Sequence, residues 1–558
     1  MQKVLPIGTD SFRRVRENGY YYVDKTLLIR DFLDFKNEVS LITRPRRFGK
    51  TLNMTMLREF FDICQDSSSL FNGLNIMGTE YASQINSRPV IFLTLKNCSG
   101  KTIEIMKNSL AHTIKNEYFK YEEILREQID FGMPVYREFY SIFEALMKIS
   151  DVTEVKDGIM QVFQMSDEML KRSLVVLIQT LAKFYDKKVL LLVDEYDQPL
   201  IKAHEMSYRE KFSKEVYGPF LGNALKGNDY LEQALLTGIQ RVAKESIFSE
   251  VNNFTVYSVV RKKYASYFGL TTQETKDLLA YYDLELDENV TSYYDGYSFS
   301  GLDIYNPWSI LSYADEKELQ SYWVNTSTNG LIRESIINAD EEFHNSFEKL
   351  IADGDVRLRL NLDASFFELA KTETLWGLLV NAGYLTVTHV DYDLMRFTVR
   401  IPNVEIKREF ELIVSDYTKL SSNMLQNMFL ALIDVNMDEF LRIYRGLVLS
   451  STSFHDSREN AYHMLFLGMV MNLRDLYEIK SNIEAGHGRS DIIMKSKSAN
   501  RPHIVIEFKQ GPDVERLKHE ALKQIHDNQY YAGLKGAILC VGIAHDVKVC
   551  QLVSEVIQ

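Results

Sequence analysis

The stretch LITRPRRFGKTLNM, residues 41–54, constrains the fold more than any other part of the chain. It joins a short apolar run to the residues Phe-Gly-Lys-Thr at 48–51 and then to the amphipathic pattern LNMTMLREFF. A phosphate-binding loop has this order, because it places backbone N–H groups at a helix amino terminus where they meet an anion. Arg44 stands where that pattern has its first glycine. The stretch therefore predicts a strand, a phosphate-binding turn with an unusual front half, and a helix.

Two acids follow a second apolar run. The segment KVLLLVDEYD, residues 188–197, is apolar on both faces, which is typical of a central strand in a parallel sheet. Asp194 at its end is placed to hold Mg²⁺, through water or through the hydroxyl of Thr51. Glu195 can polarise an attacking water as a general base. Because Lys50 is placed to reach the β- and γ-phosphates, these residues predict a site for ATP or GTP with Mg²⁺.

Flanking residues complete the predicted nucleotide site. Thr237, near the end of a further strand pattern at residues 231–241, fits the place of a residue that senses the γ-phosphate, and Arg241 is a second candidate. Two loop arginines bring positive charge to a phosphate or to an acidic partner, or else they lie on a solvated surface. The loop residues expected at the nucleotide are Arg46, Arg47, Phe48, Gly49, Lys50 and Thr51.

Apolar runs alternate with helical patterns in the first part of the chain, which predicts an α/β fold with a parallel sheet covered by helices. Residues 98–187 are expected to form a helical insertion, and residues 261–327 are Tyr-rich and turn-rich. The pattern from 328 to 442 predicts mostly helices with one strand-like patch, LMRFTVRIP. The run MLFLGMVMNL, at 464–473, is too short to cross a bilayer and predicts a buried helix. The expected strands of the first sheet are 39–44, 89–97, 188–197, 231–241 and 254–260.

Polar residues on two expected strands near the end of the chain form a second constellation. Asp491 begins a strand within GHGRSDIIMKS, and HIVIEFK carries Glu507 and Lys509. Because strand side chains alternate between faces, Glu507 and Lys509 share one face. The two carboxylates and the carbonyl oxygen of Phe508 are ligands that suit Mg²⁺ or Mn²⁺. Lys509 can orient or activate water, or stabilise charge on a phosphate.

Other polar residues near this constellation are weaker candidates. Glu484 is either an additional ligand or base, or a surface acid. His487 and His503 have no regular metal spacing and are interpreted as surface or turn residues first. The cysteines lie far apart or outside metal-ligand spacing, which indicates buried thiols in a reducing cytoplasm. They are Cys64, Cys98, Cys540 and Cys550.

Charge is distributed unevenly along the 558 residues. The formal net charge of −13 argues against a protein that coats nucleic acid along its whole surface. From position 441 onward there are 15 basic and 13 acidic residues, a net charge of +2, whereas the first 440 residues carry 49 and 64, a net charge of −15. This shift indicates a separate carboxyl-terminal module. No apolar run predicts a membrane span or a signal peptide, and nothing in the sequence indicates an oligomeric state.

A set of motifs spread over residues 3–330 resembles the bacterial AAA-ATPase-like family, which often carries a PD-(D/E)XK nuclease-like domain at its carboxyl end. The motifs are YYVDKT, RPRRFGKT, LLVDEYD, TGIQRVAKESIFSEVNN, YYDGYSF, YNPWSI and YWVNTS. In that family an arginine-rich, glycine-poor loop front is the rule, so the resemblance implies a working nucleotide site. Gln524 resembles a glutamine that follows the core of several such nucleases and is an accessory candidate.

The resemblance implies a P-loop ATPase, a mostly helical middle region and a restriction-endonuclease-like domain. The expected parts are residues 1–260, an ATPase core; 261–330, a lid or winged-helix-like extension; 331–440, a helical linker domain; and 441–558, the nuclease-like domain. The predicted function is ATP-controlled, metal-dependent binding or cleavage of DNA in the cytoplasm. The alternative is a nucleotide-switch scaffold whose nuclease-like domain binds DNA or a protein without cutting.

Overall fold

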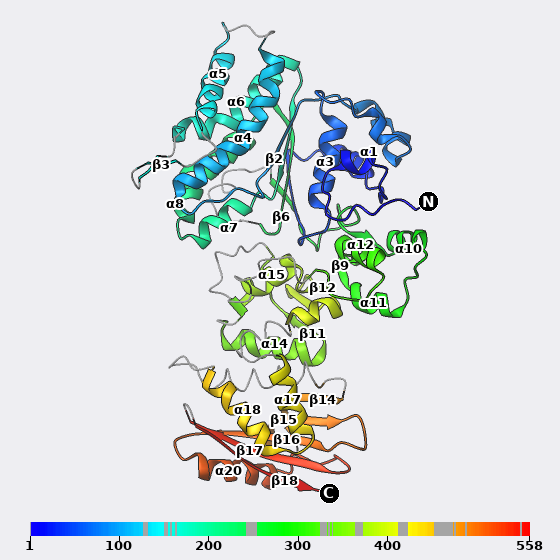
Figure 1. The fold of residues 1–558 in the computed structure, drawn as a ribbon, viewed down its shortest axis with the longest axis vertical. Helices are drawn as coiled ribbons and strands as arrows, with labels where there is room; N and C mark the ends of the chain where they lie inside the picture. Colours follow the sequence, from blue (N-terminus) through cyan, green and yellow to red (C-terminus); the bar gives the residue numbers. More distant parts are fainter. Residues whose placement is uncertain are drawn as a thin grey trace. The chain divides into compact units, whose positions relative to one another are not determined.

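The computed structural model divides the chain into two compact units (Figure 1). Unit 1 comprises Met1–Asn325 and Leu358–Phe397, and unit 2 comprises Thr326–Arg357 and Thr398–Gln558. The structure describes residues 2–126, 132–149, 154–156, 159–161, 165–241, 254–323, 332, 335–336, 339–362, 372–410, 422–450, 473, 476–485, 488–546 and 549–558.

A five-stranded parallel sheet forms the centre of unit 1, as the apolar runs predict. Its order is β2-β5-β6-β1-β7, so β6 lies between the strand that enters the phosphate loop and the strand that ends in two acids. Because all strands are parallel, their carboxyl ends meet at one edge of the sheet. The strands are β1 (Val39–Thr43), β2 (Val90–Thr94), β5 (Val189–Asp194), β6 (Leu231–Gly238) and β7 (Phe254–Tyr257).

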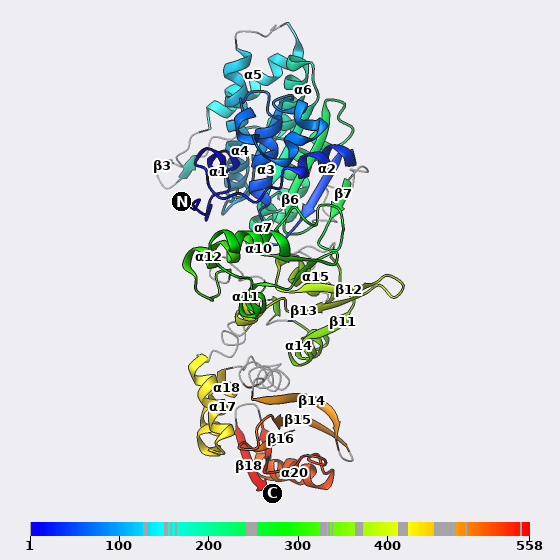
Figure 2. The same ribbon diagram turned by 90° about the vertical axis from the view of Figure 1, so that its right-hand side faces the viewer.

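Both faces of this sheet are buried. Along β5, Leu191 and Val193 pack in one hydrophobic cluster, and Leu190 and Leu192 pack in another on the opposite face. The first face is covered by α4 (Ile103–Leu125), α5 (Pro134–Met147), α6 (Asp167–Tyr185) and α9 (Gly218–Leu225) (Figure 1). The other face is covered by α1 (Phe12–Glu17), α2 (Leu27–Phe35) and α3 (Lys50–Phe61) (Figure 2).

Short elements connect these layers. The predicted insertion before β5 is helical, and it also contains a small antiparallel hairpin that was not predicted. The hairpin strands are β3 (Glu154–Lys156) and β4 (Ile159–Gln161). The short helices are η1 (Ser68–Phe71), η2 (Asn75–Gly78), η3 (Glu80–Gln84), α7 (Gln198–Glu205), α8 (Arg209–Phe212) and η4 (Ser213–Tyr217).

The residues from 270 to 316, which we call the Tyr-rich segment, form a small sheet with three helices. Thr271 and Glu274 start the first helix with a reciprocal capping box, and Asn306 caps the last. The sheet order is β8-β10-β9. The elements are β8 (Leu270–Thr271), α10 (Thr272–Tyr281), α11 (Glu288–Tyr294), β9 (Tyr297–Phe299), β10 (Leu302–Tyr305) and α12 (Pro307–Glu316).

The prediction of a middle region with a single strand-like patch is wrong, because three strands form a sheet in the order β11-β13-β12. The run TVTHVD, which lies within the predicted helical region, forms β12 because its β-branched residues favour an extended backbone. The elements are α14 (Glu341–Asp353), β11 (Asp355–Leu358), α15 (Thr372–Ala382), β12 (Thr386–Asp391), β13 (Arg396–Arg400), α17 (Ser422–Ile433) and α18 (Met437–Ser450).

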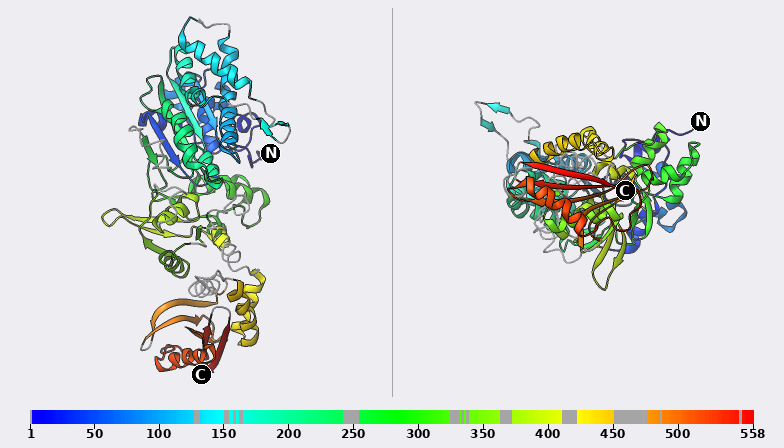
Figure 3. Two further views of the ribbon diagram at one scale, coloured as in Figure 1. Left: turned by 90° about the vertical axis from the view of Figure 1, so that its left-hand side faces the viewer. Right: turned by 90° about the horizontal axis from the view of Figure 1, so that it is seen from below.

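Unit 2 contains a five-stranded mixed sheet in the order β14-β15-β16-β17-β18. The pair β16–β17 is parallel and the other pairs are antiparallel, and α20 (Val514–Asp527) connects the parallel pair and packs against it (Figure 3). The two outer strands were not predicted. The strands are β14 (Tyr477–Ala485), β15 (Gly488–Ser496), β16 (His503–Gln510), β17 (Ile538–His545) and β18 (Cys550–Ile557).

Two predictions concern apolar runs and thiols. The helix expected at 464–473 lies outside the described residues except for its last position. Within the described ranges, no helix combines the length and the apolar character needed to cross a bilayer. Three of the four cysteines are buried and Cys64 is half-buried, and all four are unpaired thiols, as expected.

Gly542 allows α20 to lie close to the sheet of unit 2. It pairs with Glu507 across β16 and β17. A Cβ atom at this position would lie 2.4 Å from the carbonyl oxygen of Lys518 and 2.6 Å from the backbone nitrogen of Leu522, both in α20. Backbone atoms cannot yield as a flexible side chain can, so any larger residue would push the helix away from the strands.

We therefore expect Gly542→Ala to lower the free energy of unfolding of unit 2 by about 1–3 kcal/mol, the usual cost of overpacking. The measurement is urea unfolding of the full chain followed by a probe in unit 2. Gly446→Ala is the matched control, because a Cβ atom at that helical position meets nothing within 4 Å. It should leave stability unchanged or raise it by up to about 1 kcal/mol. Equal stability of the two variants would contradict the role given to Gly542.

Candidate functional sites

The predicted phosphate loop joins the end of β1 to the start of α3 and curls around its own lysine. Arg47 and Gly49 both have left-handed backbone conformations, with φ angles of 68° and 78°. Gly49 adopts this conformation without a steric cost and begins α3 as its N-cap. The buried Lys50 ammonium donates to the carbonyl oxygens of Arg44 and Pro45, at 3.0 and 2.8 Å. The ammonium is thus held at a helix amino terminus, where an anion is favoured.

Arg44, which replaces the first glycine of the usual pattern, is a buried anchor. Its guanidinium donates to the carbonyl oxygens of Thr43 and Tyr257, both at 2.8 Å, and thereby ties β1 to β7. It also lies over the rings of Phe268 and Phe299, at 5.7 and 5.0 Å from their centroids. Burial lowers its pKa to about 9. Arg44 therefore connects the start of the phosphate loop to β7 and to two aromatic rings in the protein interior.

The other two loop arginines differ in their surroundings. The guanidinium of Arg47 stacks on the indole ring of Trp308 in α12, 3.6 Å from the ring centroid, so cation–π attraction holds it there. Arg46 is half-buried and lies near Lys50. Burial lowers the pKa of Lys50, and the nearby acids Glu195 and Asp194 oppose this effect.

Asp194 is the centre of the predicted magnesium site. It is 1% exposed, and the hydroxyl of Thr51 donates to its Oδ2 atom at 2.6 Å. Its Oδ1 atom accepts a hydrogen bond from the hydroxyl of Thr237, which is fully buried on the neighbouring strand β6. A carboxylate and a hydroxyl oxygen this close together fit the oxygen preference of Mg²⁺. The structure thus brings together three residues that the sequence placed in three separate motifs.

Glu195 and Asp197 follow the end of β5. Glu195 is not a glycine, yet it has a left-handed φ angle of 52°, a conformation that costs energy and occurs often at functional sites. Burial raises its pKa, and the ammonium of Lys50 opposes this effect. Asp197 is buried and accepts the backbone N–H groups of Ile239 and Gln240, at 2.9 and 3.1 Å. It thereby fixes the turn after β6.

Neither Asp197 nor the glycine that packs against it, Gly238, was predicted to belong to the site. A Cβ atom at Gly238 would lie 2.7 Å from Oδ1 of Asp197, so only glycine lets the two turns meet. The available signal was the third acid in DEYD, three residues after Asp194. Arg241 is half-buried and directly follows the turn that Asp197 holds. Its role as a phosphate sensor stays a prediction, as does that of Thr237.

In unit 2, the predicted acids meet on adjacent strands. Asp491 is the fourth residue of β15, so the prediction that it begins the strand is wrong by three residues, because the strand starts in the turn at Gly488. Its Oδ2 atom accepts the backbone N–H of Phe508 at 2.8 Å, and its own N–H donates to Oε2 of Glu507 at 3.3 Å. The ammonium of Lys509 lies 3.6 Å from Oε1 of Glu507.

Glu507 is held from the α20 side as well. The side-chain amide of Gln524 donates to its Oε1 atom and, at 3.0 Å, to the hydroxyl of Tyr530. The amide of Asn528 donates to the same hydroxyl at 2.9 Å. Gln524 therefore lies beside Glu507, and its accessory role stays a prediction from resemblance. Tyr530 and Asn528 were not predicted.

The remaining candidates near this site have other surroundings. The Nδ1 atom of His503 accepts the backbone N–H of Ser496 at 2.9 Å, so this ring is tied to a turn. Glu484 lies in β14 opposite Arg489. His487 lies outside the described residues. Among the described residues no cluster of three or more His, Cys, Asp or Glu suits a metal. A metal here would therefore depend on two carboxylates, with a backbone carbonyl and water.

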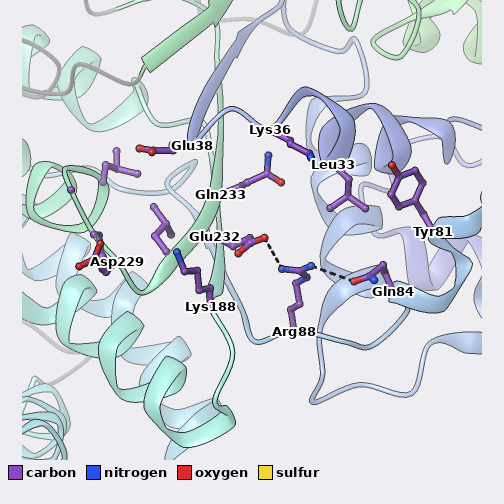
Figure 4. A pocket seen from close by; sticks show the side chains of 14 residues that line it. Leu33, Lys36, Glu38, Tyr81, Gln84, Arg88, Lys188, Asp229, Glu232 and Gln233 are labelled. Atoms are coloured by element: carbon purple, nitrogen blue, oxygen red, sulfur yellow. Dashed lines mark hydrogen bonds and ion pairs between the residues drawn. The ribbon is translucent and has the colours of Figure 1, made fainter.

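A polar pocket of about 670 Å³ lies at the other edge of the first sheet (Figure 4). Its residues Glu38, Lys188 and Leu231 stand at the amino-terminal starts of three parallel strands, so it is remote from the phosphate loop at their carboxyl ends. Arg88 in its wall already pairs with Glu232 at 3.0 Å. Cations and anions occur there in similar numbers, so its charge favours neither sign of ligand.

Comparisons with known proteins match two separate parts of the chain, one for each of the two candidate sites. Residues 6–248 match the family described as "Predicted AAA-ATPase", and residues 457–555 match the PD-(D/E)XK nuclease superfamily. The chain is also 26% identical over 413 residues to a protein of Azotobacter chroococcum mcd 1 described as "Uncharacterized protein in vnfD 5'region". That alignment covers 73% of this chain and 69% of the relative. The two matches confirm the predicted architecture of an AAA-ATPase-like part followed by a nuclease-superfamily part.

The titration of Glu507 gives a testable property of the second site. Burial raises its pKa to about 7, Asp491 adds to the effect and Lys509 opposes it. A metal needs the carboxylate, so protons compete with the metal below this pH. We expect Mn²⁺ to bind about tenfold more weakly at pH 6 than at pH 8, as one titrating group with this pKa requires. Calorimetry on the full chain measures the affinity for Mn²⁺ at the two pH values.

Glu507→Gln is the control, and it should abolish the pH dependence together with the binding. A pH-independent affinity in the parent would contradict the assignment of Glu507 as a metal ligand.

Proposed function

We propose that the protein binds and hydrolyses ATP with Mg²⁺ and that this controls metal-dependent binding or cleavage of DNA by its carboxyl-terminal domain. The observation that carries the first half is the cluster of Thr51, Asp194 and Thr237 beside the buried ammonium of Lys50. Phosphate contacts, magnesium ligands and a base must lie at one place for hydrolysis. These groups lie at, or just after, the carboxyl ends of β1, β5 and β6, which meet at one edge of the sheet.

Each residue of this site has a chemical role in the proposal. The amino terminus of α3, with Gly49 as its cap, receives the phosphates, and Lys50 turns towards them. Thr51 and Asp194 hold Mg²⁺, which when bound supplies positive charge to the phosphate oxygens. Glu195, whose pKa is raised by burial, takes the proton of the attacking water.

The other nucleotide candidates have supporting roles. Thr237 orients the carboxylate of Asp194, and in the proposal it senses the γ-phosphate together with Arg241. Arg46, whose charge acts on Lys50, would contact the phosphates. Arg47 and Phe48 hold the loop in shape from the side of the Tyr-rich segment.

The second half of the proposal rests on Asp491, Glu507 and Lys509. A phosphodiester is anionic, so it approaches two carboxylates only when a divalent cation lies between them. Asp491 and Glu507 would hold Mg²⁺ or Mn²⁺, which supplies that charge, and Lys509 would orient the attacking water. Gln524 fixes the rotamer of Glu507 from α20, and Glu484 is an accessory candidate on β14. A cytoplasmic location fits the four unpaired thiols.

The first test separates nucleotide binding from hydrolysis. Lys50→Ala should raise the Kd for ATP by about 10- to 100-fold, because it removes a charged donor. Glu195→Gln should keep the affinity and lose about 100-fold or more of turnover, because only the base is removed. Calorimetry and phosphate release measure the two effects. The controls are Lys188→Ala, at the opposite end of the sheet, and Glu210→Gln, an exposed acid. Parent-like binding by Lys50→Ala would remove this lysine from the site.

The second test concerns DNA cleavage by the full chain with ATP and Mn²⁺. Asp491→Ala and Lys509→Ala should each lower nicking of plasmid DNA by about 100-fold or more, whereas Lys535→Ala, an exposed lysine of the same domain, should cut like the parent. Equal cleavage by all variants would show that the activity lies elsewhere. Binding of metal without cleavage by the parent would favour the scaffold alternative. The net charge of +2 from position 441 onward also predicts a modest affinity for DNA that falls as the salt concentration rises.

A further inference from the structure

The front half of the phosphate loop packs against parts of unit 1 that follow the sheet in sequence. Phe48 is fully buried between the rings of Tyr297 and Phe299 in β9, with centroids 5.0 and 5.3 Å away. Arg47 stacks on Trp308, as described above. Pro45 lies against Gly383, where an added Cβ atom would come within 2.9 Å of the Cβ of the proline. Pro45, Arg47 and Phe48 thus contact three separate elements outside the central sheet.

Strand β9 connects these contacts to β12. The hydroxyl of Tyr297 donates to the carbonyl oxygen of Gly383 at 3.1 Å. The backbone N–H of Ser298 donates to the hydroxyl of Thr386, the first residue of β12, at 2.8 Å. A displacement of the loop front would therefore reach both β9 and the α15–β12 turn through packed and hydrogen-bonded groups, all within unit 1.

The lysine that would bind phosphate is bonded to this same loop front. Lys50 donates to the carbonyl oxygens of Arg44 and Pro45, and these are the residues that pack on Phe299 and Gly383. A phosphate oxygen is a stronger acceptor for an ammonium group than a carbonyl oxygen, because the hydrogen bond is charge-assisted at both ends. Phosphate and the loop carbonyls therefore compete for one ammonium.

We propose that the loop front, residues 44–48, reports nucleotide occupancy to the Tyr-rich segment and to the α15–β12 turn. When Lys50 turns to phosphate, the carbonyl groups of Arg44 and Pro45 lose their donor, and the contacts with β9 and Gly383 loosen. This inference rests on the proposed nucleotide binding and specifies how occupancy is transmitted. Because coupling between two equilibria is reciprocal, a tighter hold of the Tyr-rich segment on the loop weakens nucleotide binding by the same factor.

The test is amide hydrogen exchange of the full chain with and without a non-hydrolysable ATP analogue and Mg²⁺, with calorimetry on the same samples. We expect exchange in residues 297–305 and 380–391 to accelerate about fivefold or more on binding, at the lower end of usual coupling between sites. Helix α6, which belongs to the opposite face of the sheet, should not change. In Tyr297→Leu most of this response should be lost, because the ring contact with Phe48 and the hydrogen bond to the carbonyl oxygen of Gly383 are removed.

Tyr392→Leu is the matched control, because it is the same kind of aromatic-to-leucine change at a tyrosine that is 73% exposed in the turn between β12 and β13. It should respond like the parent. Saturating nucleotide binding with unchanged exchange in both segments would overturn the coupling and leave the proposed function intact, as would an identical response in Tyr297→Leu. Absence of nucleotide binding in calorimetry would overturn both proposals together.

Discussion

The buried carboxylate of Asp194 is the group on which the nucleotide half of the structure depends. A buried carboxylate is costly unless hydrogen bonds replace its water, and here hydroxyl groups from α3 and β6 satisfy one oxygen each. The bonds require the ends of β1, β5 and β6 to lie side by side, which the sheet order provides. Because β6 lies between β1 and β5, Thr237 can donate the second hydrogen bond to the carboxylate of Asp194.

Much of this arrangement could be predicted because its signals are local. The five strands follow from apolar runs that are buried on both faces, and Gly49, Lys50 and Asp194 follow from short motifs at strand ends. The partners of the loop front could not be predicted in the same way. Trp308 and Gly383 lie hundreds of residues from the loop, and nothing in their local sequence encodes a contact with it.

The same distinction holds in the nuclease-like unit. The alternation of side chains along a strand was enough to place Glu507 and Lys509 together, and a short connection placed Asp491 beside them. Of the outer strands, β18 was missed because its apolar and polar residues alternate irregularly, whereas YEIKSNIEA in β14 alternates regularly and could have been predicted. Gly542 was missed because its role is to admit the backbone of α20, a requirement that appears only when helix and strand are packed.

The two sites share an electrostatic design. In each, burial raises the pKa of a glutamate and a neighbouring lysine opposes the effect: Lys50 acts on Glu195, and Lys509 acts on Glu507. Each lysine also has an oxygen partner within the protein, two loop carbonyls in the first site and the glutamate in the second. A phosphate or a metal must therefore displace an internal contact when it binds. This exchange lowers the intrinsic affinity, but it also ensures that binding changes the protein around the site, because only a ligand with different contacts in two states can shift their balance. Sites prepared in this way suit a protein in which one ligand is expected to control the use of another.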